Sequence, residues 1–122
     1  MVVVHDAARP LASSSLFAAV VKAVGDGADG AVPGLPVADT VKRVEGDVVV
    51  ETVDRALLVA VQTPQAFRVD VLRRAHGGDP EATDDAALVE RVGGRVVVVA
   101  GEADNRKITT PGDLAAARLL VG

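Results

Sequence analysis

Two of the three short, uninterrupted runs of valine in this chain constrain its fold more than any other feature. They lie at Val2–Val4 and Val96–Val99, and a brief β-branched run of this kind is typical of a strand buried on both faces. Phe17 and Phe67 are the only aromatic residues, so the core has to be built from aliphatic side chains. The chain of 122 residues is long enough for a single domain with a substantial core.

Segments with helical periodicity alternate with the strand-like runs. Apolar residues recur at three- and four-residue spacing after serines or threonines that suit an N-cap, and glycines follow them as stop signals. These patterns predict helices within residues 13–27, 67–75 and 83–94 and from Thr110 onward, and further strands at 30–37 and 58–62. Alternation of this type predicts an α/β fold with a largely parallel sheet.

Residues 37–53 stand outside this alternation. Two β-branched segments, 39–44 and 47–53, flank the turn sequence Glu-Gly-Asp, which is a hairpin signal. We therefore expect a β-hairpin that leaves the body of the domain as an arm.

Charge and composition narrow the classes of partner. Lys and Arg number 13 against 17 Asp and Glu, a net charge of −4, which disfavours nucleic acids and anionic membrane surfaces. No stretch reaches the roughly 18 apolar residues of a membrane span, and the first ten residues lack the features of a signal peptide. The absence of cysteine excludes disulfides and thiolate metal sites and agrees with a cytoplasmic setting.

Polar residues follow both valine runs. His5, Asp6 and Arg9 come after the first, and Lys107 lies in the segment 103–111 after the second. In open α/β sheets, ligands bind outside the carboxyl ends of the strands. There Asp6 suits a divalent metal or a ribose hydroxyl, and Arg9 and Lys107 suit phosphate. A capping carboxylate and solvated surface charges explain the same pattern, so both interpretations stay open on spacing alone.

Other polar residues carry weaker signals. Asp104 and Asn105 either ligate a metal or fix their loop, and Thr63 and Gln65 bracket a proline before Phe67. Thr40, Lys42 and Arg55 lie on the limbs of the expected hairpin, where charges usually serve solubility. Asp84 and Asp85 at a helix start are explained by the helix dipole. His5 and His76 have no second histidine at a metal-ligand spacing.

Six short motifs stand in a distinctive order along the chain. They are HDAARP, DTVKR, TVDR, QTPQAF, TDDA and ADNRKITTP. In this order and spacing, over about residues 2–121, the chain resembles the 2-C-methyl-D-erythritol 4-phosphate cytidylyltransferases. That family transfers a cytidylyl group from CTP to methylerythritol phosphate in non-mevalonate isoprenoid biosynthesis. The products are CDP-methylerythritol and pyrophosphate.

The resemblance implies a fold and a set of site residues. The fold is a nucleotide-binding, Rossmann-like nucleotidyltransferase sheet with helices on both faces and a protruding β-arm, residues 37–55, that interlocks a homodimer. Mg²⁺ assists the reaction, and Arg55 reaches into the partner subunit's site. Carried over residue by residue, the resemblance implies catalytic Asp6, Arg9 and Lys107, substrate-binding Ala7, Thr40, Arg55 and Thr63, and metal-binding Asp6 and Asp104.

Family members are longer than this chain. Their N-terminal part carries a Gly-rich loop that grips the CTP phosphates, so residues 1–122 are expected to form a partial domain, the C-terminal half, that is inactive alone. A piece of a longer protein, a misassigned start and a truncated gene are all compatible with the sequence. Two other functions stay open: a ribitol-5-phosphate cytidylyltransferase, and a non-catalytic module that binds a sugar phosphate and dimerises.

Overall fold

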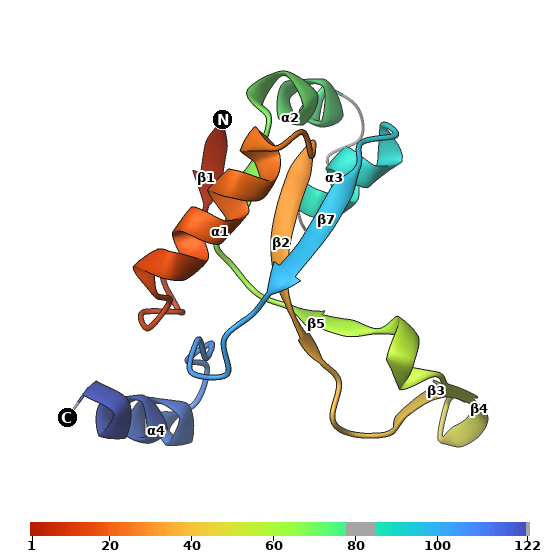
Figure 1. Cartoon of the computed structure of the whole chain (residues 1–122). Coiled ribbons are helices and arrows are strands. Elements are labelled where there is room, and N and C mark those ends of the chain that lie inside the picture. The colour runs from red at the N-terminus through yellow and green to blue at the C-terminus, as the bar shows by residue number, and fades with distance from the viewer. Residues whose placement is uncertain (78–84, 122) are drawn as a thin grey trace.

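The computed structural model describes residues 1–77 and 85–121 (Figure 1). In chain order the elements are β1 (Val2–Val4), α1 (Ser14–Gly25), β2 (Gly30–Pro36), β3 (Val41–Glu45), β4 (Val48–Val53), a 3₁₀ turn (Arg55–Leu57), β5 (Val59–Val61), β6 (Gln65–Phe67), α2 (Val69–His76), α3 (Asp85–Arg91), β7 (Val96–Ala100) and α4 (Pro111–Val121). The expected α/β class is confirmed. No helix in the described ranges combines the length and apolar content needed to cross a membrane.

The main sheet is mixed, which corrects the expectation of a largely parallel sheet. Strand β2 pairs in parallel with β7 and antiparallel with β5 and β6, and β1 pairs antiparallel with β6. The reason is that the chain returns from the arm directly along β2, without the crossover helix that a parallel connection needs. Strands β1, β2 and β7 consequently run in one direction, and β5 and β6 run in the other.

Helices cover both faces of the sheet, as predicted. Successive strand residues point to opposite faces, and the two buried clusters follow this rule. Val32 and Phe67 pack with α2 and α3, whereas their neighbours Ala31 and Ala66 pack with α1. The core is aliphatic apart from Phe67, which is fully buried.

The valine runs are less buried than predicted. Val2, Val3 and Val4 are 37%, 38% and 36% exposed, and Val98 in β7 is 52% exposed. Both strands lie at borders of the sheet, because within the described chain β1 hydrogen-bonds to β6 and β7 to β2. A β-branched run indicates a strand but not the number of its neighbours.

Two helix caps agree with the sequence. The Ser13 hydroxyl accepts a hydrogen bond from the Leu16 amide at the start of α1. At α4 the Thr110 hydroxyl accepts from the Asp113 amide, and the Asp113 carboxylate accepts from the Thr110 amide, which is a capping box. The pKa of Asp113 is lowered, chiefly by the hydrogen bond from the Thr109 amide. The predicted cap Thr83, and Asp84 beside it, lie outside the described residues.

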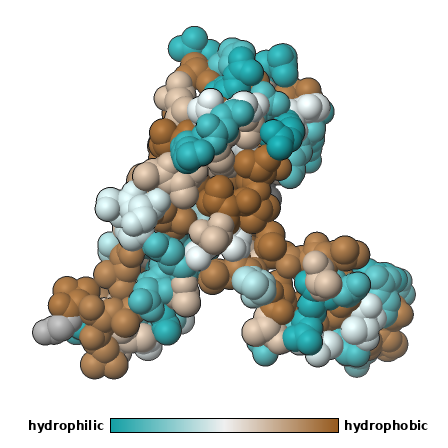
Figure 2. All heavy atoms as spheres, viewed as in Figure 1, coloured by the Kyte–Doolittle hydropathy of each residue, from teal (hydrophilic) through white to brown (hydrophobic). Residues whose placement is uncertain are grey.

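The predicted hairpin exists and projects from the body as an arm, here defined as residues 37–58 (Figure 1). Strands β3 and β4 form a separate two-stranded sheet, with Lys42 bonded to Thr52 across it. Val44, Val48 and Val49 on the arm are each more than half exposed. Figure 2 shows apolar surface on this arm and on α4, which also stands apart from the body.

Phe67 is predicted to dominate the stability of the body. Phe67→Ala should lower the free energy of unfolding by about 3–5 kcal/mol, because it removes a fully buried ring and leaves a cavity. The ring packs so closely on β2 that a Cβ on Gly30 would lie 2.8 Å from Phe67 Cδ1. Urea unfolding followed by circular dichroism measures the loss. The half-buried Phe17 is the control: an equal loss in Phe17→Ala would contradict this account.

Candidate functional site

Strand direction brings three distant loops to one edge of the sheet. The loop that contains His5 and Arg9 follows β1, and the loop of residues 101–107 follows β7. Because β1 and β7 run the same way, their carboxyl ends lie at the same edge. The antiparallel strand β6 starts at that edge, so residues 62–64 join the group. Loops that are far apart in the chain therefore meet.

The three loops surround a cavity of about 390 Å³. Asp6, Arg9, Thr63 and Lys107 line it, and these are four of the residues predicted for the site. The remaining wall consists of Val4, Val61, Gln62, Gln65 and Asp85. We name this hollow the strand-end cavity.

A network of hydrogen bonds through His5 fixes the loop after β1 against residues 62–64. The Asp6 amide donates to the Thr63 hydroxyl oxygen at 3.0 Å, and that hydroxyl lies 3.0 Å from His5 Nδ1. On the other side of the ring, His5 Nε2 lies 2.9 Å from the Arg9 carbonyl oxygen, which can only accept. The network thus assigns the proton to Nε2 and makes Nδ1 the acceptor for Thr63. His5 acts as a structural link, in agreement with its lack of metal-ligand spacing.

Arg9 is the most constrained cation of the cavity. Its Nη1 donates to the Asn105 carbonyl oxygen at 2.8 Å, and its Nε lies 3.7 Å from Asp6 Oδ2. The Arg9 side chain is only 13% exposed, against 42% for Asp6. Arg9 Nε is buried without a hydrogen-bond partner among the described residues. The guanidinium therefore holds an unused donor in a fixed position beside the cavity.

Charges of both signs face the strand-end cavity. Arg9 and Lys107 supply the positive charge and Asp6 and Asp85 the negative charge. Asp85 also contacts a residue that is not part of the cavity wall, since its Oδ1 lies 2.9 Å from His76 Nε2. From the sequence, Asp85 is interpreted only as a helix-start residue favoured by the helix dipole. Its place in the wall depends on how α3 packs on the sheet, which no local pattern reveals.

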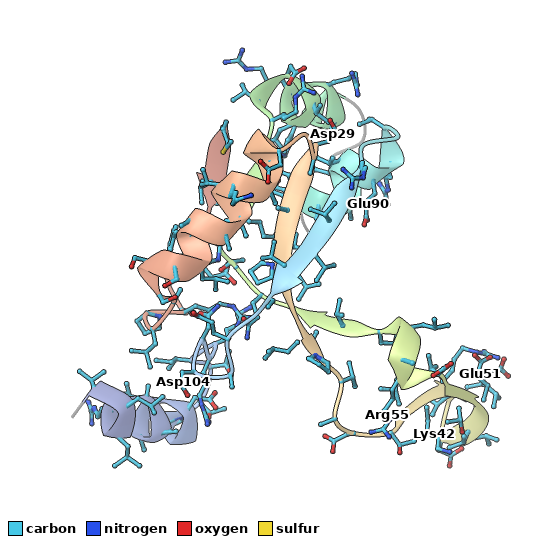
Figure 3. The ribbon with its side chains drawn as sticks, viewed as in Figure 1. Asp29, Lys42, Glu51, Arg55, Glu90 and Asp104 are labelled. Carbon is cyan, nitrogen blue, oxygen red and sulfur yellow. The ribbon has the colours of Figure 1, made fainter. Side chains whose placement is uncertain are left out.

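Four predicted site residues are not in the strand-end cavity. Asp104 lines a neighbouring hollow of about 370 Å³ with Ser13 and Glu102. Ala7 is exposed and does not appear in the cavity wall. Figure 3 shows Arg55 on the arm, beside Lys42 and well away from Asp104. Thr40 is exposed on the same arm, and Arg55 donates a hydrogen bond to the Ala38 carbonyl there.

Three buried amides, Gln62, Gln65 and Asn105, belong to the site, and the sequence analysis named all of them except Gln62. Gln62 is 7% exposed and Asn105 is completely buried. For Asn105 the structure supports the interpretation that it fixes its loop, because its Nδ2 donates to the Thr63 carbonyl oxygen at 2.8 Å. Gln62 received no role of its own, although it is the first residue of the QTPQAF motif.

Comparison with known proteins gives a consistent result over the whole chain. The family model described as 2-C-methyl-D-erythritol 4-phosphate cytidylyltransferase matches residues 1–122. A protein of that name from Rubrobacter xylanophilus is 49% identical over 97% of this chain and 53% of its own length. Another from Saccharopolyspora erythraea is 52% identical, over 99% of this chain and 55% of its own.

A similar solved structure carries the same enzyme name. The crystal structure of 2-C-methyl-D-erythritol 4-phosphate cytidylyltransferase from Thermus thermophilus superposes with a TM-score of 0.83 at 43% identity. The superposition covers 98% of this chain and 60% of that one. The chain thus spans about half the length of the curated relatives described above.

The Thr63 hydroxyl is predicted to hold residues 62–64 and the loop after β1 together. Thr63→Val keeps the shape but leaves the Asp6 amide and His5 Nδ1 without their partner, at an expected cost of about 1–3 kcal/mol in the free energy of unfolding. Hydrogen exchange of the Asp6 amide should accelerate as well. Thr63→Ser retains the hydroxyl and is the control. If Thr63→Val were as stable as Thr63→Ser, the link would have no energetic role.

Proposed function

The chain belongs to the 2-C-methyl-D-erythritol 4-phosphate cytidylyltransferase family, and from this premise we propose that its strand-end cavity forms part of a cytidylyltransferase active site. The reaction is the transfer of a cytidylyl group from CTP to methylerythritol phosphate. The supporting observation is the convergence of Arg9 and Lys107 with Asp6 and Thr63 around one cavity. An anion and a polyol are the ligand chemistry that this set of side chains suits.

The proposed mechanism uses positioning and charge rather than a protein nucleophile. The phosphate of methylerythritol phosphate attacks the α-phosphorus of CTP, a new P–O bond forms, and pyrophosphate leaves with the electrons of the broken P–O bond. Arg9 would bind phosphate oxygens through its fixed guanidinium, and Lys107 would add a mobile point charge. Both cations would stabilise the negative charge that develops during transfer.

Asp6 fits the role of a magnesium ligand. Within the described ranges no three acidic or histidine side chains gather around a common point, so a closed protein cage is not formed. Mg²⁺ bound to nucleotides commonly uses one or two carboxylates, with phosphate oxygens and water as the other ligands. Asp6 meets that requirement in the strand-end cavity, where Asp85 is the other carboxylate. Bound there, Mg²⁺ would neutralise phosphate charge. Asp104 faces the other hollow, so its metal role, like the cytoplasmic location, stays a prediction.

The arm supports a proposal of homodimerisation. Thr40 and Arg55 can help to hold methylerythritol phosphate only if they meet a strand-end cavity other than their own (Figure 3). A two-stranded ribbon is marginally stable by itself, and the arm exposes the apolar side chains of Val44, Val48 and Val49. A second copy of the chain would cover these side chains and receive Arg55 at its cavity.

Binding of the sugar phosphate tests the proposed function. Calorimetric titration of the chain with 2-C-methyl-D-erythritol 4-phosphate should show saturable binding. Lys107→Ala should weaken it by about ten-fold or more, because a charged hydrogen bond to phosphate is lost. Lys22→Ala is the matched control, since Lys22 is an exposed cation that pairs with Asp26 on α1. Binding that is absent, or equal in the two variants, would refute the proposal.

Titration with a second sugar phosphate distinguishes the methylerythritol-phosphate enzyme from a ribitol-phosphate enzyme. D-Ribitol 5-phosphate in the same titration should bind more weakly than methylerythritol phosphate. Stronger binding would favour the ribitol-phosphate enzyme. Turnover of CTP, followed as pyrophosphate release, separates a catalyst from a module that only binds the sugar phosphate.

The arm is predicted to hold two copies together. Val49→Asp places a charge on an exposed apolar pair, since Val49 lies opposite Val44 in the hairpin. Sedimentation should therefore show a dimer for the unaltered chain and a monomer for Val49→Asp, with weaker binding of methylerythritol phosphate in the monomer. Val21→Asp, at an exposed position on α1, should leave the dimer intact. A monomeric unaltered chain would contradict the dimer proposal.

A further inference from the structure

Two neutral amide side chains, those of Gln62 and Asn105, connect loops that surround the strand-end cavity. Gln62 and Asn105 are nearly or completely buried, at 7% and 0% exposure. Buried amides usually find partners for their donors and their acceptor; Gln62 uses both ends, whereas Asn105 uses its Nδ2 donor and its Oδ1 is buried without a hydrogen-bond partner among the described residues. The partners that each amide selects therefore report which pieces of the chain it fixes.

Gln62 pairs with the backbone of Glu102 as a strand neighbour would. Its Nε2 donates to the Glu102 carbonyl oxygen at 2.9 Å, and its Oε1 accepts from the Glu102 amide at 3.1 Å. The close approach depends on Gly101, because a Cβ there would lie 2.9 Å from Gln62 Oε1 and 3.1 Å from the Gly34 carbonyl oxygen. One side chain thus anchors the loop after β7 to the loop before β6.

Asn105 continues the connection to the first loop. Its Nδ2 donates to Gln62 Oε1 at 3.2 Å and to the Thr63 carbonyl oxygen at 2.8 Å. The backbone carbonyl oxygen of Asn105, not its side chain, accepts from Arg9 Nη1 at 2.8 Å. The residue is in this way bonded to both other loops, to residues 62–63 through its side chain and to Arg9 through its backbone, and Lys107 follows two residues later.

We propose that Gln62 and Asn105 are positioning residues that set the spacing of Arg9, Thr63 and Lys107 for a single phosphorylated ligand. They act through those three residues: Asn105 does not line the strand-end cavity, and Gln62 contributes to its wall while its amide group is bonded to the Glu102 backbone. The proposal rests on the function proposed above as far as the ligand is concerned. The spacing itself is a property of the chain without ligand, so the two ideas can be tested separately.

The choice of amides follows from the chemistry of the contact. The Thr63 carbonyl and Gln62 Oε1 are both acceptors and face Asn105 Nδ2, so a donor is required at that position. A carboxylate of the same shape would bring a third acceptor and a buried charge. An apolar side chain would fill the space but lose the hydrogen bonds from Asn105 Nδ2 to Gln62 Oε1 and to the Thr63 carbonyl oxygen.

The test compares Gln62→Met and Asn105→Ala with Ser13→Ala. Ser13 is the matched control because it bonds the Glu102 carboxylate of the same loop from the opposite side. Two amides report the loop spacing: that of Ile108, which donates to the Ala8 carbonyl oxygen, and that of Asp6, which donates to Thr63. Their hydrogen exchange is measured relative to the amides of β2, which removes the effect of overall stability.

In Gln62→Met and Asn105→Ala both reporter amides should exchange about ten-fold faster relative to β2, with no such change in Ser13→Ala. The dissociation constant for methylerythritol phosphate should rise by about ten-fold in the first two variants only. If Asn105→Ala does not fold, Gln62→Met decides, since methionine is uncharged and similar in volume. Unchanged relative exchange in Gln62→Met, or an equal change in Ser13→Ala, would overturn the proposal. If the unaltered chain binds no methylerythritol phosphate while the exchange results hold, the proposed function fails and the positioning role stands.

Discussion

The antiparallel return of residues 59–67 along β2 is the pairing on which the rest of the structure depends. Strand β5 covers the end of β2 and β6 covers its start, and the Gln62 amide bonds to the Pro33 carbonyl oxygen between them. Within the described chain, β1 is joined to the sheet through β6. The return segment therefore decides both where β1 lies and which loops share an edge with it. The strand-end cavity is a consequence of that one register.

Local parts of this fold could be predicted from the sequence, because their causes are local. The caps at Ser13 and Thr110 each involve a hydroxyl and an amide three residues later, and the hairpin turn lies within a few positions of both its strands. Strand direction and neighbour number depend on pairings over tens of residues. For that reason the sheet turned out mixed, and the valines of β1 more exposed than their β-branched run indicated.

The residues of the candidate site likewise fall into two groups: those that local sequence could predict and those that depend on the course of distant parts of the chain. Asp6, Arg9 and Lys107 could be predicted because each follows a predicted strand, at the end where ligands bind, and because their motifs resemble those of a family. Thr63 could be predicted from the resemblance alone. The burial of Gln62 and the outward direction of Asp104 depend on the course of an irregular loop. Two neighbouring residues of such a loop, Asp104 and Asn105, face different surroundings. Residue type alone does not distinguish them.

The arm and the cavity wall are close neighbours along the chain. Strand β5 ends at Val61, and Gln62 and Thr63 of the cavity wall follow directly. The two-stranded sheet of the arm is separate from the main sheet and is joined to it through residues 37–40 and 54–58, so these two junctions set the angle at which the arm leaves the body. A substitution at either junction would therefore redirect the tip of the arm without changing a residue of the cavity wall.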